Sequence, residues 1–186
     1  MKTKLKRNSD IIVVGNGGSI LDKNKGWAID NYNEVVRFNN YRIVGYEADV
    51  GTKTTIWFTC NCAERKIQAD YKEIYFHSWQ WDRNKVECYR KIKEVHPGLK
   101  QTRKKDVEYL KQQIPNYPHQ CFSTGLIAIK ILLERYSRID LIGFDWHTGK
   151  HPHHYGDNEP RGHLHQPQLE RDYLVKLNKQ GKINFL

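Results

Sequence analysis

Residues 10–19 read DIIVVGNGGS, an apolar run that ends in a glycine-rich turn. The run is long enough for one buried parallel strand. A glycine turn at the carboxyl end of a first strand lets backbone N–H groups approach a phosphate, which is typical of nucleotide sites in open α/β sheets. Gly15, Gly17 and Gly18 lack the G-x-G-x-x-G spacing, so a hydride-transfer cofactor is disfavoured. Taken alone, the turn is equally consistent with an ordinary tight turn.

Apolar runs and helical periodicity alternate along the rest of the chain. We predict strands at Asp10–Val14, Glu34–Phe38, Thr54–Phe58, Glu73–His77, Arg138–Gly143 and Lys182–Phe185. We predict helices at Ala63–Asp70, Lys85–Val95, Lys104–Ile114, Thr124–Tyr136 and Gln168–Gln180. This order indicates an α/β fold with a mostly parallel sheet and helices on both faces. A chain of 186 residues is most simply one domain, spanning residues 1–186.

The net charge of +10 indicates anionic partners. Between Arg83 and Lys111, ten Lys or Arg residues stand against four acids, on a stretch with helical periodicity. This stretch predicts either two surface helices with solvated basic faces or a contact face for an anionic partner. The partner would be a phosphorylated acceptor, an anionic membrane surface or nucleic acid. Nucleic acid is disfavoured because none of its standard recognition motifs occurs.

The cysteine pattern and the N-terminal sequence indicate the cellular compartment of the protein. Cys60, Cys62, Cys88 and Cys121 have neither zinc spacing nor the density of a disulfide scaffold, so free thiols are expected. The N-terminus lacks the pattern of a signal peptide, and no apolar segment reaches the length of a membrane span. We therefore expect a cytoplasmic protein that contacts a membrane at most peripherally.

A second segment of interest begins at Cys121 and continues to Tyr136. Ser123 or Thr124 can cap a helix here, and the unpaired N–H groups of such a helix start can bind an anion. The strand that follows ends at Gly143. The segment is thus either part of a nucleotide pocket or an ordinary helix cap.

Six of the nine histidines lie between positions 147 and 165. A zinc site must be considered, although no pair has the spacing of H-E-x-x-H on a helix. Acid–base chemistry is the second interpretation. Pro167 suits the first turn of a helix, which puts His165 before that helix and Glu170 in its first turns. The positive end of the helix dipole favours a neutral His165, as a general base requires.

Taken together, these segments resemble the sialyltransferases, family 29 of the glycosyltransferases, whose members share four ordered motifs. The long motif is matched within residues 13–54, VVGNGGSILDKNKGWAIDNYNEVVRFNNYRIVGYEADVGTKT. The short motif is matched from Ser123-Thr-Gly125 to Gly143, the third by His154 and Tyr155 followed by Asp157, and the last by His165 to Glu170. Roughly residues 59–118 are unmatched, and acceptor choice is expected to lie there.

The resemblance implies a Rossmann-like sheet, a variant of the glycosyltransferase A-type fold. It also implies an inverting enzyme that transfers a keto-sugar, sialic acid or Kdo-like, from a CMP-sugar donor to a hydroxyl of a glycan or lipid-linked glycan. No metal and no other cofactor would be needed. The sequence agrees in having no Asp-x-Asp of the type that holds a divalent ion against a pyrophosphate.

The resemblance also assigns roles to residues. His165 would deprotonate the acceptor hydroxyl, with Glu170 in support, and His154 would hydrogen-bond the departing phosphate. Asn16 and Asn39 would contact the phosphate or ribose. The nucleotide and donor site would be completed by Gly15, Gly17, Ser123, Thr124, Gly125, Gly143 and Tyr155.

Two departures from the family pattern indicate a compact member of bacterial or viral type. The cysteines that bridge the long and short motifs in secreted-pathway members are replaced by Ile11 or Ile12 and by Tyr136, and the membrane anchor and stem are not found. Two other hypotheses stay open. One is a metal-dependent hydrolase or transferase that uses the histidine-rich loop, and the other is a catalytically inactive, basic protein that binds nucleotides or anions.

Overall fold

The structure is a computed structural model that describes residues 10–60, 64–67, 69–78, 83–118, 121–145, 153–156 and 165–186. Its strands are β1 (Ile11–Val14), β2 (Glu34–Phe38), β3 (Ile56–Thr59), β4 (Glu73–Phe76), β5 (Lys100–Gln101), β6 (Ile139–Ile142) and β7 (Ile183–Phe185). Its helices are η1 (Gly18–Ile20), α1 (Gly26–Asp30), α2 (Glu47–Val50), α3 (Glu64–Ile67), α4 (Arg83–Val95), α5 (Lys104–Gln113), α6 (Thr124–Leu132) and α7 (Pro167–Lys179). The strands form one sheet in the order β5-β4-β3-β2-β1-β6-β7, and all its pairings are parallel.

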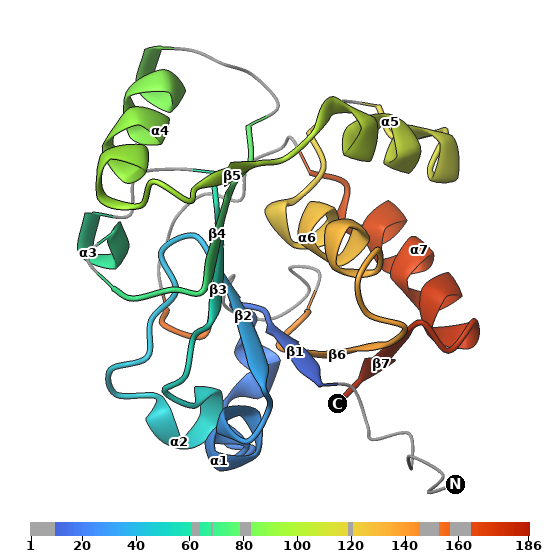
Figure 1. Cartoon of the computed structure of the whole chain (residues 1–186). Coiled ribbons are helices and arrows are strands. Elements are labelled where there is room, and N and C mark those ends of the chain that lie inside the picture. Colours follow the sequence, from blue (N-terminus) through green and yellow to red (C-terminus); the bar gives the residue numbers. More distant parts are fainter. Residues whose placement is uncertain are drawn as a thin grey trace, which may run out of the picture.

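Helices cover both faces of this sheet, because alternate side chains of the strands point to opposite faces. Ile11 and Val13 join a core cluster with apolar residues of α5, α6 and α7. Ile12 and Val14 join another cluster with apolar residues of η1, α1 and α2. Figure 1 shows α5, α6 and α7 on one side of the sheet and α1 to α4 on the other. The predicted α/β, Rossmann-like fold is therefore confirmed.

The element boundaries differ from the prediction where the backbone makes local turns. The predicted helix Thr124–Tyr136 ends at Leu132, where the turns tighten: the N–H of Glu134 donates to the Ile131 carbonyl at 3.2 Å and that of Arg135 to the Leu132 carbonyl at 2.9 Å, each only three residues back. The predicted strand Thr54–Phe58 is shifted to Ile56–Thr59. Of the predicted helix Ala63–Asp70, Glu64–Ile67 is a helix, while Ala63 and Gln68 lie outside the described residues.

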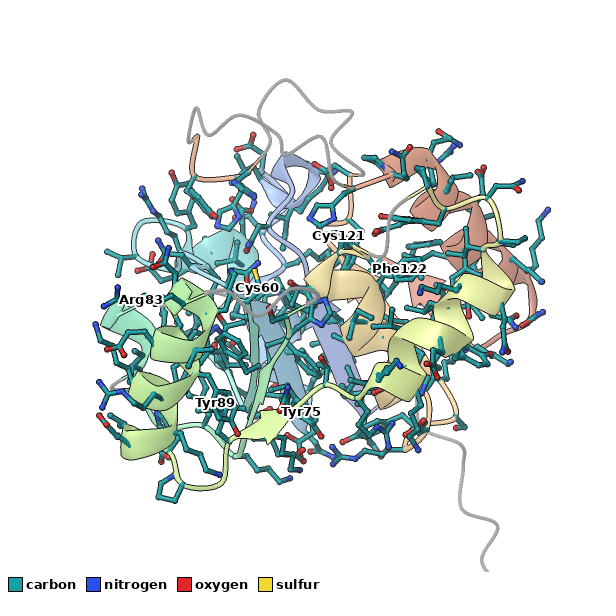
Figure 2. All side chains as sticks on the ribbon, turned by 90° about the horizontal axis from the view of Figure 1, so that it is seen from above. Cys60, Tyr75, Arg83, Tyr89, Cys121 and Phe122 are labelled. Carbon is teal, nitrogen blue, oxygen red and sulfur yellow. The ribbon has the colours of Figure 1, made fainter. Side chains whose placement is uncertain are left out.

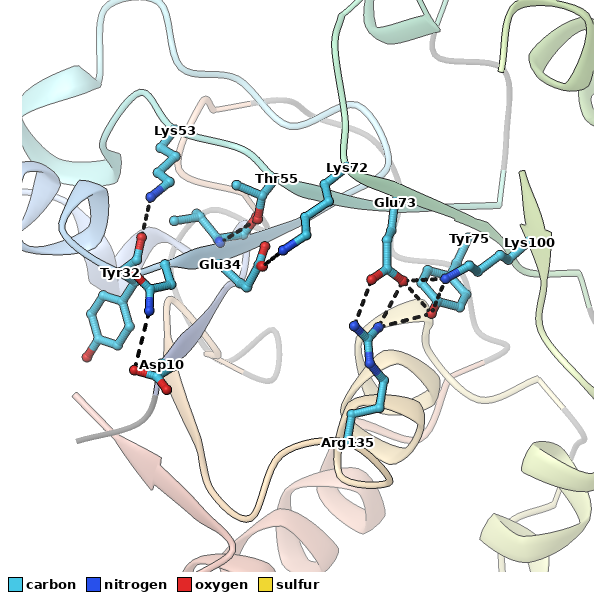
Figure 3. Close-up of polar contacts among 12 residues, drawn as sticks. Asp10, Tyr32, Glu34, Lys53, Thr55, Lys72, Glu73, Tyr75, Lys100 and Arg135 are labelled. Atoms are coloured by element: carbon cyan, nitrogen blue, oxygen red, sulfur yellow. Dashed lines mark hydrogen bonds and ion pairs between the residues drawn. The ribbon is translucent and has the colours of Figure 1, made fainter. Parts of the chain in front are cut away.

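The amino-terminal edge of the sheet is held by ion pairs (Figure 3). Glu73, the first residue of β4, accepts hydrogen bonds from Arg135 at 2.7 and 2.8 Å, from Lys100 at 2.6 Å and from Tyr75 at 2.8 Å. Burial raises the pKa of Glu73, but these hydrogen bonds outweigh it and lower the pKa to about 2. The acidic groups at this edge are thus engaged with the protein itself.

The opposite, carboxyl-terminal edge has the geometry of a binding site. The chain builds β1 to β5 toward one side of the sheet and then returns to add β6 and β7 on the other side of β1. Loops after β1 and β6 therefore diverge at a topological switch point, where ligands bind in open α/β sheets. Gly15 follows β1 and Gly143 follows β6, so both lie at this point.

No helix in the described ranges is long and apolar enough to cross a membrane.

Candidate functional site

At the switch point, the backbone after β1 lies directly against the backbone after β6. The N–H of Gly15 donates to the carbonyl of Ile142 at 2.8 Å, and that of Gly17 donates to the carbonyl of Gly143 at 2.9 Å. A Cβ at Gly15 would lie 2.2 Å from the Gly143 oxygen, and Gly143 itself has a φ of +72°. Gly15 is needed because there is no room for a side chain, and Gly143 because its backbone is left-handed and a Cβ there would lie 2.8 Å from the Gly15 oxygen.

Asp145 holds the same turn from the side of β6. Its carboxylate accepts the backbone N–H of Ser19 at 2.7 Å and also the Ser19 hydroxyl proton. A Cβ at Gly17 would meet this carboxylate at 2.5 Å. The N–H groups of Gly15, Gly17 and Ser19 are therefore bonded to protein and do not form an open phosphate cradle. That Gly15 and Gly17 contact the donor stays a prediction.

Asn16 and His154 connect this turn to the loop after β2. The side-chain amide of Asn16 donates to the Phe38 carbonyl at 3.4 Å. The backbone N–H of His154 donates to the Asn16 carbonyl at 2.7 Å. The ring nitrogens of His154 face two carbonyl oxygens, Nδ1 that of Asn16 at 3.2 Å and Nε2 that of Arg42 at 3.0 Å. A neutral ring has one N–H and donates to one of them at a time.

His154 is only 5% exposed. Burial lowers its pKa, and the carbonyls of Arg42 and Asn16 oppose that shift. Because both ring nitrogens face protein carbonyls, a direct bond from His154 to a phosphate needs one of these contacts to open. The role of His154 at the phosphate stays a prediction.

Asn39 joins the ends of β2 and β3. Its φ is +48°, a left-handed conformation that Asn tolerates better than most residues. Its N–H donates to the Phe58 carbonyl at 2.8 Å, and its side-chain oxygen accepts the N–H of Cys60 at 3.0 Å. Its side-chain NH₂ has no partner within the described ranges, so it is available to a ligand at the carboxyl edge.

Tyr155 lies beside His154 in a cluster of rings. Its ring meets that of His154 edge to face at 4.9 Å and stacks on that of His153 at 4.9 Å. The guanidinium of Arg42 lies over the Tyr155 ring, 4.9 Å from its centre. Arg42 is exposed and was not among the residues predicted from the sequence.

The start of α6 has the predicted cap. The hydroxyl of Ser123 accepts the N–H of Leu126 at 3.1 Å, and the next two residues, Thr124 and Gly125, open the helix. A Cβ at Gly125 would lie 3.3 Å from the ring of Phe144. The N–H groups of Thr124 and Gly125 belong to the first turn, where a helix offers no internal acceptor. The helix start is thus able to receive a hydrogen-bond acceptor from a ligand.

Glu170 of α7 reaches the same helix start. Its carboxylate accepts the Ser123 N–H at 2.8 Å, the Ser123 hydroxyl and the Tyr117 hydroxyl at 2.8 Å. Only 6% of Glu170 is exposed. This negative charge at the positive end of α6 stabilises the helix and leaves less positive potential for a phosphate there. Neutral parts of a nucleotide suit this position better.

His165 precedes α7 and lies against the segment that leads into α6. Its Nδ1 is 2.8 Å from the carbonyl oxygen of Cys121. A carbonyl only accepts, so Nδ1 carries the proton and Nε2 of the neutral ring keeps its lone pair. In the described ranges, Nε2 of His165 has no hydrogen-bond partner. This is the protonation state that a general base needs.

A second histidine, which sequence reasoning missed, lies at the same edge. His77 follows β4, is 2% exposed and contacts the Thr102 hydroxyl through Nδ1 at 2.9 Å. Its buried Nε2 forms no hydrogen bond of good geometry with the described residues. The pKa of His77 is lowered to about 4, mainly by burial; a contact with the Phe122 backbone opposes the shift, and the nearby His165 and Lys85 add to it. The position of a polar residue at the end of a predicted strand was the only sequence signal for it.

The cysteines do not all follow the prediction. Figure 2 labels Cys60, which follows β3, and Cys121, which lies near α6, and both are free thiols. Burial raises the pKa of Cys121 to about 11. Cys88 is disulfide-bonded, so the expectation of a free thiol is wrong for it. Cys62 lies outside the described residues.

The predicted metal alternative is only partly covered by the structure. His147, His151, His163 and Asp157 lie outside the described residues. In the ranges that are described, no group of three or more His, Cys, Asp or Glu residues could hold a metal ion.

The comparisons with known proteins agree with these motifs. The family model of glycosyltransferase family 29 (sialyltransferase) matches residues 2–182. The chain is 50% identical over 48 residues, 26% of this chain and 13% of the relative, to a human CMP-N-acetylneuraminate-beta-1,4-galactoside alpha-2,3-sialyltransferase. It is 27% identical over 179 residues to the human CMP-N-acetylneuraminate-beta-galactosamide-alpha-2,3-sialyltransferase 4.

That second alignment covers 77% of this chain and 53% of the relative, so the chain spans about half the length of such relatives. The crystal structure of a mammalian sialyltransferase superimposes with a TM-score of 0.71 at 21% identity, over 95% of this chain and 68% of that one. This likeness shows a shared fold.

Proposed function

We propose a function from the premise that this chain belongs to glycosyltransferase family 29, the sialyltransferases: transfer of a keto-sugar, sialic acid or Kdo-like, from a CMP-sugar to a hydroxyl of a glycan. Residues 1–186 would act as a single catalytic domain. The observation that carries the proposal is the contact of His165 Nδ1 with the Cys121 carbonyl, 2.8 Å away. This contact leaves Nε2 as the proton acceptor next to the predicted nucleotide-binding site at the start of α6.

The reaction we propose is one displacement with inversion. The acceptor O–H gives its proton to Nε2 of His165 while its oxygen attacks the anomeric carbon of the sugar. The bond from that carbon to the phosphate oxygen breaks, and CMP leaves with the electron pair. Groups that bind the phosphate stabilise the charge that develops on it.

Two parts of the edge would hold the donor. The cytidine and ribose would lie at the start of α6, by Ser123, Thr124 and Gly125, where the Glu170 carboxylate favours neutral groups. The narrow backbone contact at Gly143 would let the base approach closely. The phosphate would lie toward Asn16, Asn39, His154 and Tyr155.

We propose that this transfer needs no metal ion and no other cofactor. Support comes from the roles available to the side chains, since His165 can take the proton and Asn16 and Asn39 can bind the departing group. The chelator in the experiment below tests this part directly.

The acceptor would be a glycan or a lipid-linked glycan. On α4 and α5, several cations are neutralised locally, as when Arg90 pairs with Glu87 at 3.0 Å and with Glu94 at 2.5 Å. Lys105 forms no ion pair within the described ranges and would contribute to contact with an anionic acceptor or membrane surface. The cytoplasmic location stays a prediction, and the disulfide-bonded Cys88 weighs toward an oxidising compartment.

The test is a calorimetric titration of CMP into the protein with chelator present, with UDP, GDP and AMP as controls. Selective CMP binding at about 1 mM or tighter, roughly 4 kcal/mol, supports the donor site. Release of CMP from CMP-sialic acid in the presence of glycan acceptors then tests transfer. Equal binding of all four nucleotides, or none, contradicts the proposal, and activity abolished by chelator favours a metal-dependent enzyme.

A further inference from the structure

Arg42 places a charged group beside the candidate site. It lies in the loop that follows β2 and is exposed. Its guanidinium lies over the Tyr155 ring at 4.9 Å, a cation–π contact that orients a long side chain while leaving its N–H groups open to solvent. The sequence motifs did not single this residue out.

The backbone around Arg42 ties it to the predicted phosphate-binding residues. Its carbonyl oxygen is 3.0 Å from Nε2 of His154, and the backbone N–H of His154 donates to the Asn16 carbonyl at 2.7 Å. Arg42, Asn16, His154 and Tyr155 therefore form one connected group. A ligand that contacts the Tyr155 ring beside Arg42 would meet the guanidinium, which lies 4.9 Å from the centre of that ring.

Nearby carboxylates are occupied by other partners. Glu47 accepts the N–H of Gly45 at 3.0 Å, and Asp49 accepts the N–H groups of Asp22 at 3.0 Å and Asn24 at 2.7 Å. Arg42 forms no ion pair with any residue in the described ranges. Its charge is thus not neutralised by the side chains described around it.

Positive groups also lie near His154, together with the carboxylate of Asp49. Burial is the main reason why the pKa of His154 is lowered, and the charges of Arg37 and His153 lower it further. Arg37 is 1% exposed and donates to backbone carbonyls, including that of Lys53 at 3.2 Å. A buried cation and an exposed cation near this one histidine outnumber the Asp49 carboxylate and favour an anionic ligand.

We propose that Arg42 binds an anionic group of the donor and so determines donor affinity, an inference that rests on the proposed function. A CMP-sugar of the keto-acid type carries two such groups, the phosphate and the carboxylate of the sugar. A guanidinium can bind either one through two parallel hydrogen bonds.

The experiment compares the wild-type chain with R42Q, and with K179Q as a control that removes an exposed cation in the last turn of α7. Each is titrated with cytidine, CMP and a fluorinated, non-transferable CMP-sialic acid. If Arg42 binds the phosphate, R42Q weakens binding of CMP and of the analogue by about tenfold or more and leaves cytidine binding unchanged. If it binds the sugar carboxylate, only the analogue binds more weakly. R42K keeps the charge but loses the paired N–H donors of the guanidinium. Its affinity should lie between those of wild type and R42Q.

Other results would overturn the proposed role of Arg42. Equal affinities of wild type and R42Q for all three ligands overturn the role of Arg42 while the proposed function stands. A similar loss for cytidine as for CMP shows a purely structural role and also overturns it. If the wild-type chain does not bind CMP at all, the proposed function fails and this inference fails with it.

Discussion

The carboxylate of Glu170 accepts hydrogen bonds from both the backbone N–H and the hydroxyl of Ser123, 47 positions earlier in the chain. It also accepts the Tyr117 hydroxyl at 2.8 Å. One buried side chain thus fixes α7 to the start of α6. His165 lies just before α7. The Glu170 contacts therefore hold the predicted base close to the predicted nucleotide-binding site at the start of α6.

Replacing Glu170 with Ala should destabilise the protein by about 2–4 kcal/mol, because it removes the acceptor of the Ser123 N–H and of the Ser123 hydroxyl and leaves the Tyr117 hydroxyl only the Cys121 carbonyl, 3.3 Å away. Urea unfolding measures this. Glu94→Ala is the matched control, since Glu94 is an exposed partner of Arg90 and should cost about 0.5 kcal/mol or less. Equal losses for the two variants would contradict the structural role of Glu170.

Gly15→Ala should destabilise the fold by about 3 kcal/mol, because the new methyl group meets a backbone oxygen that cannot move aside. Gly98→Ala places its methyl group in open space and should be neutral or slightly stabilising. Thermal unfolding of the two variants side by side tests this. A Gly15→Ala protein as stable as wild type would mean that the strand ends are further apart than described.

His165→Ala should leave CMP affinity nearly unchanged and lower turnover by about two to four powers of ten, the usual contribution of a general base. The reason is that Nε2 is the group that takes the proton, whereas no contact to the nucleotide is assigned to the ring. Initial rates and CMP titrations on the same preparation separate the two effects. Normal turnover would remove His165 from the role of base.

Asn39→Gly should weaken CMP binding by about tenfold, because it removes the side-chain amide. Glycine keeps the left-handed backbone, φ +48° in the native chain, so strain does not confuse the result. Unchanged CMP affinity with an unchanged melting temperature would argue against a contact between Asn39 and the nucleotide.

Stability should rise with pH between about 4 and 6.5 because of His77. Its native pKa is lowered to about 4 from an ordinary value of 6.5, so in this window the unfolded chain binds a proton that the native state excludes. The full effect is about 3 kcal/mol, present above pH 6.5 and lost as the pH falls toward 4.

His77→Phe keeps an apolar ring and removes the titrating group, so its stability should change less between pH 5 and pH 7 than that of wild type. Urea unfolding at both pH values gives the comparison. Identical slopes for the two proteins would show that His77 is not protonated on unfolding in this window. Glu73 titrates natively near pH 2 and so changes stability mainly below this range.

Much of the fold could be predicted because the strands are uninterrupted apolar runs. Ile11 to Val14, for example, is fully buried on both faces of the sheet, and no other element accommodates such a run so well. The helices α1 and α2 were missed because five and four residues are too few to show helical periodicity. The strand β5 has only two exposed residues, Lys100 and Gln101, and so carries no apolar signal.

The parts of the site that depend on short sequence motifs could be predicted. The cap at Ser123 and the position of His165 ahead of α7 follow from local rules, and both are present. Asp145 and Arg42 could not be found in that way. Asp145 acts on Ser19, 126 positions away, and Arg42 acts with Tyr155, so the fold had to bring them together before their roles were visible.

The contact between Gly15 and Gly143 has a consequence for how this fold can change over evolutionary time. A buried pair of side chains, such as Glu170 with Ser123, can in principle be exchanged by two compensating substitutions. No second substitution can compensate at Gly15, because the atom it would strike is the backbone oxygen of Gly143. We therefore expect descendants of this chain to keep both glycines for as long as β1 and β6 remain neighbours, whatever sugar or acceptor they come to use.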